Sequence, residues 1–411
     1  MKENKFQIKK SVLLDIAFCL FFAVATNADW MSNPFLWWGV IVLVFFTQFL
    51  LYRGKICFGI TKYKLWWGSF LIICVVSAIY SINRNDSVAM IKTLIILAIM
   101  MVYVESELKD IDSIHRIMKL YVIGIGITLC YVLITQDMNQ FQLAQIGEGN
   151  TGRWNGNDIG MNAAVIVTMS IYLLPKTKKV LMKICYLLID LVSLYLIYWM
   201  GSRKTIIFLI LAICGIILLK KPRKLIRNIL IVLCIVAISW NAVLEIPALY
   251  QNIGWRLEAL MASVTGKGAV DSSTLLREKY IEVGIESFKE SPVIGYGINT
   301  YREINQVKTG HRTYSHNNFI EIAVGLGIVG IISYYWLYVY LIVGYIKNFI
   351  RKESTFLINV LFILFGLYLS MQVGLVSYEG ITQWMLLLLL YKALCLNRQK
   401  NLGNYLIRNM I

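Results

Sequence analysis

Charged residues and prolines are scarce in this 411-residue chain, and both shortages exclude classes of protein. Asp, Glu, Lys and Arg make up 15% of the residues, whereas hydrophobic residues make up 58%. Soluble domains carry about 25% charged residues, so the composition excludes a soluble enzyme. It is also too apolar for a disordered chain. With only 5 prolines and no low-complexity tract, the sequence leaves no room for a flexible linker.

Disulfide and metal-binding patterns are missing as well. The 8 cysteines form no C-x-x-C pair and lie mostly within apolar blocks, so we expect neither a disulfide framework nor a cysteine metal site. The 3 histidines are too scattered for a histidine metal cluster. We therefore expect no metal and no cofactor. The net charge of +17 could indicate nucleic acid binding. Membrane proteins, however, carry an excess of Lys and Arg in their cytoplasmic loops, and this explanation comes first. We therefore predict no nucleic acid partner.

Apolar blocks of about 20 residues, the length that crosses a membrane as a helix, dominate what is present. We expect an all-α polytopic membrane protein, because helices satisfy their own backbone groups in lipid. The first block lacks a cleavage signal and reads as a retained span. The sequence predicts about 12 transmembrane helices, at residues 11–28, 35–52, 65–82, 87–104, 117–135, 160–174, 180–200, 205–219, 226–244, 317–346, 355–376 and 381–396.

The basic residues predict the orientation of these helices. If the N-terminus is cytoplasmic, 27 of the 40 Lys and Arg residues fall in the seven cytoplasmic segments, as the positive-inside rule requires. Both termini are then cytoplasmic. The predicted division is residues 1–244 with nine helices, a large external loop of 72 residues at 245–316, and residues 317–411 with three helices and a cytoplasmic tail.

The long external loop carries structure of its own. Between Thr274 and Ser291, apolar residues recur at helical spacing among charged ones, which predicts an amphipathic helix on the membrane surface or against the bundle. Pro292 ends this helix. A tight turn follows at Gly295-Tyr296-Gly297. The loop closes with a polar run, Arg312 to Asn318, directly before the next span.

Several arginines lie on the predicted outer side of the membrane. Basic residues there run against the positive-inside rule, so each one calls for an explanation. Arginine is always charged and can grip phosphate oxygens with a bidentate fork, so a converging group of them would suit a diphosphate. The alternative is that each one binds lipid headgroups or pairs with a nearby glutamate. The candidates are Arg153, Arg203, Arg256 and Arg277.

His316 is the candidate for proton transfer, because histidine can accept a proton near neutral pH. It lies at the outer membrane boundary within the polar run, and Tyr314 and Asn317 could orient a ring or a sugar beside it. The alternative is a surface histidine without a role. A histidine base without a carboxylate nucleophile beside it would suit one type of reaction. In that reaction the base takes the proton of a hydroxyl, and the hydroxyl oxygen attacks a donor that already carries a good leaving group.

The order of motifs resembles the O-antigen ligase and O-antigen polymerase superfamily of integral membrane glycosyltransferases. His316-Asn317 precedes Gly327-Ile328-Val329-Gly330 by nine residues, which matches the family's H-N-x9-G-x-x-G pattern, with Phe319-Ile320-Glu321 inside it. Upstream, Pro292 to Gly297 resembles the P-x-x-G-x-G turn, and Gly201-Ser202-Arg203 resembles the family's outer Ser-Arg turn. Gly152-Arg153 resembles an arginine-containing loop that comes earlier in the family's sequences. The motifs cover roughly residues 150–330, and we expect the glycines at 325–330 to allow close helix packing.

The resemblance implies a GT-C-like fold in the bacterial plasma membrane and a metal-independent, inverting transfer of a glycan from an undecaprenyl-diphosphate donor. It implies that Arg203 and Arg277 hold the diphosphate, with Arg153 or Arg256 in support. His316 would take the proton from the acceptor hydroxyl. Tyr314, Asn317 and Glu321 would contact the substrate. The family's loop arginine corresponds to Arg256 or Arg277. The implied partners are a lipid-linked oligosaccharide, membrane lipids, and a chain-length regulator or flippase of the same pathway.

Within this superfamily we favour a polysaccharide repeat-unit polymerase. Four alternatives remain, and one of them, a purely structural membrane scaffold, would leave the outer arginines unexplained. An O-antigen ligase would use the same donor but lipid A core as its acceptor. A lipid-linked oligosaccharide flippase or other transporter would show charges inside the bundle, such as Asp15 and Asp190, and two similar halves; no internal repeat is visible. A peptidoglycan polymerase would need an acidic catalytic residue in the loop, for which Asp271 is a candidate.

Overall fold

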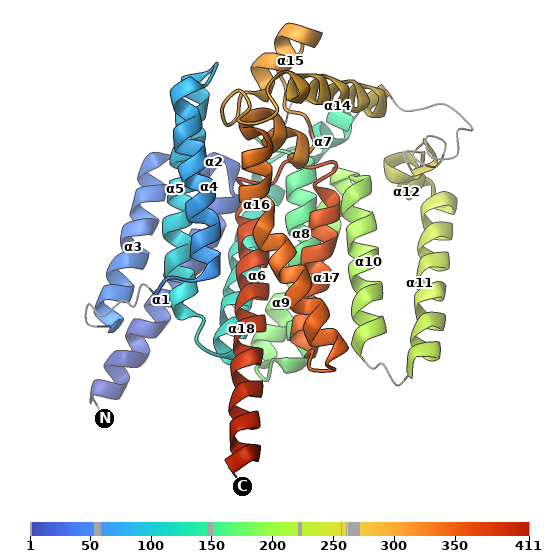
Figure 1. The fold of residues 1–411 in the computed structure, drawn as a ribbon. Coiled ribbons are helices and arrows are strands. Elements are labelled where there is room, and N and C mark those ends of the chain that lie inside the picture. Colours follow the sequence, from blue (N-terminus) through green and yellow to red (C-terminus); the bar gives the residue numbers. More distant parts are fainter. Residues whose placement is uncertain are drawn as a thin grey trace. The chain divides into compact units, whose positions relative to one another are not determined.

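The computed structural model describes residues 2–52, 59–145, 151–220, 224–255, 257–259, 261 and 272–410. Over these ranges the chain is helical and contains no strand (Figure 1), which confirms the all-α class. The chain divides into two compact units. Unit 1 comprises Met1–Cys57 and Tyr103–Met261, and unit 2 comprises Phe58–Val102 and Ala262–Ile411.

The predicted apolar blocks coincide with helices, and eight of the described helices are long and apolar enough to cross a membrane by length and composition. The chain is therefore a polytopic membrane protein, while the count of 12 spans and their orientation stay predictions. The eight are α3 (Pro34–Tyr52), α4 (Lys62–Tyr80), α5 (Arg84–Glu107), α6 (Ile111–Thr135), α8 (Gly156–Leu173) with η1 (Leu174–Lys176), α9 (Val180–Met200), α11 (Leu225–Glu245) and α16 (Asn318–Ile350). The other four blocks lie in α1 (Lys2–Thr26), α10 (Arg203–Lys220), α17 (Phe356–Met371) and α18 (Ile381–Met410).

Unit 1 is a helical bundle in which α1 packs against α3 and α6, and α8 packs against α6, α9 and α10. Small residues allow the close approach of α1 and α6. A Cβ atom on Gly124 would lie 2.7 Å from the carbonyl oxygen of Cys19. The Thr128 hydroxyl donates to the carbonyl of Ala23 at 2.8 Å. The short elements of this unit are α2 (Ala28–Met31), α7 (Met138–Gln145), α12 (Pro247–Leu249) and η3 (Tyr250–Gly254).

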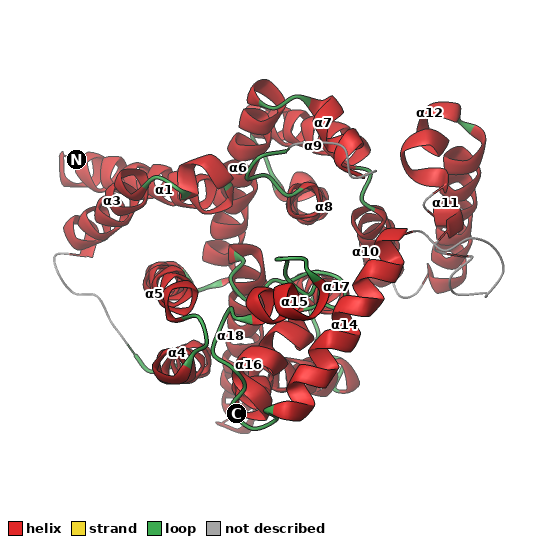
Figure 2. Cartoon of the chain, turned by 90° about the horizontal axis from the view of Figure 1, so that it is seen from above, coloured by secondary structure: helices red, strands yellow, loops and turns green. Residues whose placement is uncertain are grey.

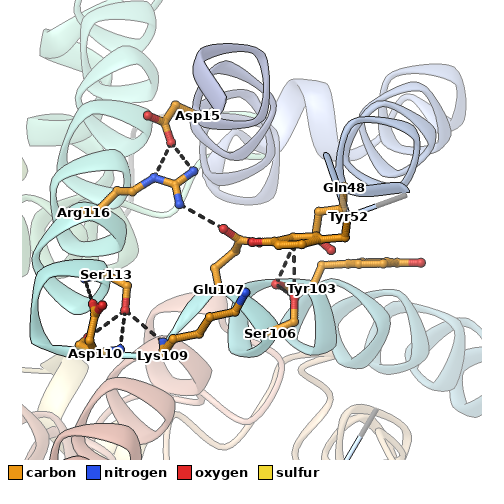
Figure 3. A network of polar contacts seen from close by, with 10 residues as sticks. All are labelled: Asp15, Gln48, Tyr52, Tyr103, Ser106, Glu107, Lys109, Asp110, Ser113 and Arg116. Carbon is orange, nitrogen blue, oxygen red and sulfur yellow. Dashed lines mark hydrogen bonds and ion pairs between the residues drawn. The ribbon is translucent and has the colours of Figure 1, made fainter. Parts of the chain in front are cut away.

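A polar network joins α1, α3 and α6 to the end of α5 in unit 1 (Figure 3). The Arg116 guanidinium contacts Asp15 at 2.6 Å and Glu107 at 2.9 Å. Glu107 in turn accepts hydrogen bonds from Tyr52 at 2.8 Å and from Gln48 at 3.1 Å. Buried charges persist in a membrane protein where they are paired and hydrogen-bonded, and this network provides both.

The acidic residues that a transporter would use have structural partners instead. Asp15 is held by Arg116, and Asp190 of α9 accepts a hydrogen bond from the Ser170 hydroxyl of α8 at 2.6 Å. Each carboxylate therefore fastens two neighbouring helices. Both contacts account for the presence of these charges within spans without a transport pathway.

Unit 2 contains α4, most of α5, and α14 (Ser272–Glu290), α15 (Tyr301–Thr309), α16, α17 and α18. The expected amphipathic helix is present as α14, which ends two residues before Pro292. In the view along the long helices, α4, α16 and α18 are seen end-on, whereas α14 lies across them (Figure 2). A buried cluster of Tyr280, Tyr301 and Val324 joins α14, α15 and α16.

Helix α16 is broken at Gly327, whose φ of 62° and ψ of −160° are not helical. The break leaves backbone groups without helical partners, and the turn after α14 supplies them. The carbonyls of Val324 and Gly325 accept from the amides of Tyr296 and Gly297 at 2.9 and 2.8 Å. On the other side of the break, the Ile328 amide donates to the carbonyl of Pro292 at 2.9 Å. Because unsatisfied backbone groups are costly inside a membrane, this pairing stabilises the broken helix.

The expectation that these glycines serve helix packing was wrong for Gly327. The structure places the backbone of the Pro292–Gly297 turn against it, so that a Cβ atom on Gly327 would overlap the carbonyl of Val293. Only glycine also adopts this φ and ψ readily. The two glycine motifs of the sequence therefore meet, one in the turn and one at the helix break.

Candidate functional site

The segment before α16 is fixed by a small set of hydrogen bonds around Ser315. The Ser315 amide donates to the carboxylate of Glu321 at 2.7 Å, and the Ser315 hydroxyl donates to the carbonyl of Asn317 at 2.8 Å. Asn317 caps α16, since its side-chain oxygen accepts from the amides of Phe319 and Ile320. Ser315, Asn317 and Glu321 are all buried. The residue between Ser315 and Asn317 is thereby held on both sides.

That residue, His316, has a left-handed backbone with φ of 57°. A residue other than glycine keeps this conformation when the surrounding structure enforces it, and such residues cluster at functional sites. The imidazole lies between two aromatic rings. Its centroid is 4.1 Å from the ring of Tyr314 and 6.4 Å from the ring of Tyr280, which is nearly parallel to it. The backbone and the two rings together set the direction of the imidazole.

His316 lines a cavity of about 400 Å³ in unit 2. One wall comes from α14, whose residues 276, 277 and 280 fall on one face of the helix. The other wall comes from the segment that leads to α16. Two of the sequence candidates, Arg277 and His316, are therefore brought to the same cavity. The full lining is Leu276, Arg277, Tyr280, Gly310, His311, Arg312, Thr313 and His316.

Arg312 is a second guanidinium at this cavity, and it is anchored by acidic residues. It contacts Asp86 at 2.9 Å and Glu303 at 2.6 Å. This hydrogen-bonded pairing holds the pKa of Glu303 below its usual range and raises the pKa of Arg312. The Asn83 side chain also donates to Glu303 at 2.7 Å. These contacts fix the wall of the cavity that Arg312 forms, while Arg277 brings charge from α14.

Arg302 approaches the site from behind Tyr314. Its guanidinium carbon lies 5.7 Å from the centre of the Tyr314 ring, within the range of a cation–π contact. Tyr314, which was expected to orient a substrate, therefore lies between Arg302 and His316. This arrangement restrains the Tyr314 ring, which is tilted by 43° against the imidazole.

Two further arginine candidates belong to unit 1. Arg203 is the first residue of α10, and it is buried. It follows a sharp turn, since α9 ends at Met200 and Gly201 has a left-handed φ of 53°. Arg153 is exposed, in the segment before α8. A hydrogen bond of 2.8 Å from the Ser202 hydroxyl to the Asn157 side chain links the turn before α10 to the start of α8. Unit 1 thus joins the two elements that carry these arginines.

The remaining candidates divide into two groups. Arg256 and Asp271 lie outside the described residues, whereas Arg277 lines the cavity in unit 2. Asn317 and Glu321 make the local hydrogen bonds described above, and substrate contact by either one stays a prediction.

Sequence reasoning missed Tyr280, His311, Arg312 and Arg302 as site residues. Two signals were present. Tyr280 lies three residues after Arg277, and residues at that spacing share one face of a helix. Arg312 begins the polar run that contains His316, and His311 directly precedes that run. The position of Arg302 behind Tyr314 depends on how α15 packs, which no local pattern shows. Among the described residues, no group of three His, Cys, Asp or Glu side chains is placed to hold a metal.

Comparison with known families gives one match. The model of a family described as O-antigen ligase matches residues 188–335. The matched region begins in α9, includes the turn with Arg203, and ends within α16 beyond the break at Gly327. It also includes Arg277 and His316. No curated protein matches the chain.

Proposed function

Because residues 188–335 match the O-antigen ligase family model, we propose that the chain is a polysaccharide repeat-unit polymerase of the O-antigen ligase and O-antigen polymerase superfamily. In this proposal it transfers a glycan from an undecaprenyl-diphosphate donor to a hydroxyl of a lipid-linked acceptor, at the outer face of the bacterial plasma membrane. The product is a surface polysaccharide such as a capsule, an exopolysaccharide or an O-antigen.

The observation that carries the proposal is the cavity in unit 2 that Arg277 and His316 share. A guanidinium group can bind the oxygens of a diphosphate through two parallel hydrogen bonds. An imidazole can accept a proton near neutral pH. Transfer from a diphosphate-linked sugar can use both groups, and the hydrogen bonds around Ser315 hold His316 in place.

In the proposed reaction, His316 takes the proton of the acceptor hydroxyl as that oxygen attacks the anomeric carbon of the donor. A new glycosidic bond forms while the bond between the anomeric carbon and the diphosphate oxygen breaks, with inversion at the carbon. Negative charge builds up on the departing diphosphate. Arg277 stabilises that charge as a fixed electrostatic partner.

The choice of polymerase over ligase depends on the acceptor. The composition, rich in Lys, Ile and Asn, is typical of low-GC bacteria, many of which have no lipid A core to serve as the ligase acceptor. A second lipid-linked repeat unit is then the acceptor, and the chain grows. The ligase is the alternative in the same superfamily, because it uses the same donor and the same chemistry.

Reconstitution in vesicles with undecaprenyl-diphosphate-linked repeat units tests this function. The wild type should produce a ladder of growing chains on a gel. His316→Gln should abolish the ladder, while His115→Gln should retain it. His115 is a matched control, since its ring lies in unit 1, where it shares a hydrogen bond of 2.9 Å with the Tyr172 hydroxyl of a neighbouring helix. Full activity of His316→Gln would refute the proposed base, and transfer to lipid A core without chain growth would favour the ligase.

A further inference from the structure

The opposite end of α16 carries a second cavity, unrelated to the one that holds His316. It is a groove of about 640 Å³ between the last turns of α16 and the middle of α18. After the break at Gly327, α16 runs without interruption from Ile328 to its cap at Arg351, 23 residues later, about 35 Å along a helix that rises 1.5 Å per residue. This exceeds the roughly 30 Å hydrocarbon thickness of a bilayer. The groove therefore lies at the other membrane surface from His316.

The groove has two chemically different parts. Its inner part is apolar and is formed by Val343 and Gly344 of α16 together with Leu394 of α18. Its outer rim carries three cations, Lys347, Arg351 and Arg398. We call these six residues and the space between them the basic groove.

The three cations of the basic groove have no ion-pair partner among the residues that the structure describes. One acidic residue, Glu353, lines the same groove. The rim thus keeps a net positive charge beside an apolar floor.

Contacts made by several of its lining residues hold the groove in place. The Asn397 amide donates to the side-chain oxygen of Asn348 at 3.0 Å and to the carbonyl of Glu353 at 3.1 Å. These bonds join α18 to α16 and to the turn that follows it. At the inner end, the Lys62 ammonium lies 4.1 Å from the centre of the Tyr340 ring, which also lines the groove. The separation of the two helices is therefore fixed rather than adjustable.

We propose that the basic groove binds an anionic membrane phospholipid, with the phosphate headgroup on the cationic rim and an acyl chain along the apolar floor. Basic pockets between helices at a membrane surface suit such headgroups. A soluble phosphate would use only the rim and leave the apolar floor without a role. The floor and the rim together match a molecule with a charged head and a hydrocarbon tail.

Native mass spectrometry of the full-length protein with added cardiolipin, phosphatidylglycerol or phosphatidylcholine tests this proposal. The two anionic lipids should be retained and phosphatidylcholine should not. Each basic residue near a membrane surface contributes about fivefold in affinity, so Arg351→Gln with Arg398→Gln should weaken retention about 25-fold. The matched control is Lys178→Gln with Lys179→Gln, which removes two charges from an exposed segment outside the groove.

A second variant separates the tail site from the rim. Gly344→Leu keeps every charge but fills the floor, where a Cβ atom would already touch Leu394 at 3.4 Å. It should weaken lipid retention without loss of folding, since leucine favours a helix more than glycine does. Equal weakening by the control pair would overturn the proposal. Competition by inorganic phosphate as effective as by lipid, or unchanged retention in both groove variants, would also overturn it.

Discussion

At the scale of single residues, the site depends on how firmly its few polar groups are held. His316 adopts a left-handed backbone, and the residues on either side of it, Ser315 and Asn317, are held by hydrogen bonds. Glu321 is central to this, because its buried carboxylate accepts the amide hydrogen of the buried Ser315. A buried amide that loses its acceptor costs about 1–3 kcal/mol. Glu321 therefore acts as a positioning residue for His316 in our account.

Glu321→Ala should lower kcat strongly and reduce thermal stability, because the Ser315 amide loses its acceptor and His316 loses its restraint. Glu321→Gln should retain much of the activity, since its side-chain oxygen can still accept. Glu282→Ala, at an exposed position on α14, serves as the control. Steady-state kinetics in vesicles with thermal unfolding measure both effects. If the folded Glu321→Gln variant were as inactive as the alanine variant, the carboxylate charge would contact substrate instead.

Sequence reasoning identified Arg277 and His316 because their chemistry is visible in residue type and position. It did not identify Arg312, whose contacts with Asp86 and Glu303 join segments that are far apart in the chain. The same reason explains the restraint on Tyr314 by Arg302. Residue type reveals a candidate, whereas its neighbours depend on tertiary packing.

At the scale of elements, the break in α16 is the feature that shapes unit 2. The turn at Pro292–Gly297 pairs with both sides of the break, and it connects α14 to the rest of the site. Apolar patterning predicted α14 and α16 correctly, because each has a clear periodicity or length. It could not predict the break, since a glycine within an apolar run is also typical of helix packing.

Gly327→Ala should destabilise the protein, because its φ and ψ suit glycine and the added methyl group would overlap the Val293 carbonyl. The backbone strain alone should cost about 1–3 kcal/mol. Gly366→Ala is the matched control, since no atom lies within 4 Å of the added Cβ there, and it should be neutral or slightly stabilising. Thermal unfolding in detergent measures both. An unchanged melting temperature for Gly327→Ala would contradict the described helix break.

At the scale of the whole molecule, the apolar blocks predicted the helices well, because membrane spans need long apolar runs. The division into units was not accessible in this way. Residues 58–102 join the C-terminal part of the chain in unit 2, although nearly 160 residues separate them from it in the sequence. Contacts such as Trp66 with the Tyr334 carbonyl at 2.6 Å make this connection, and no local pattern signals them.

The predicted orientation places the segment at residues 260–300 outside the plasma membrane. Alkaline phosphatase fused within this segment should therefore be active, because the enzyme folds only outside the cytoplasm. A fusion after Lys179, in a segment predicted to be cytoplasmic, should be inactive. Inactive fusions within 260–300 would reverse the topology and remove the basis for the proposed donor.

The central claim is that Arg277 binds the diphosphate of a lipid-linked donor in the cavity it shares with His316. Titration of the purified protein with undecaprenyl diphosphate tests this most directly. A hydrogen bond to a charged group contributes about 1.5–3 kcal/mol, so Arg277→Gln should weaken binding at least about tenfold. Lys289→Gln, which removes one charge from an exposed position on the same helix, should bind like the wild type. Equal binding by wild type and folded Arg277→Gln would contradict the account.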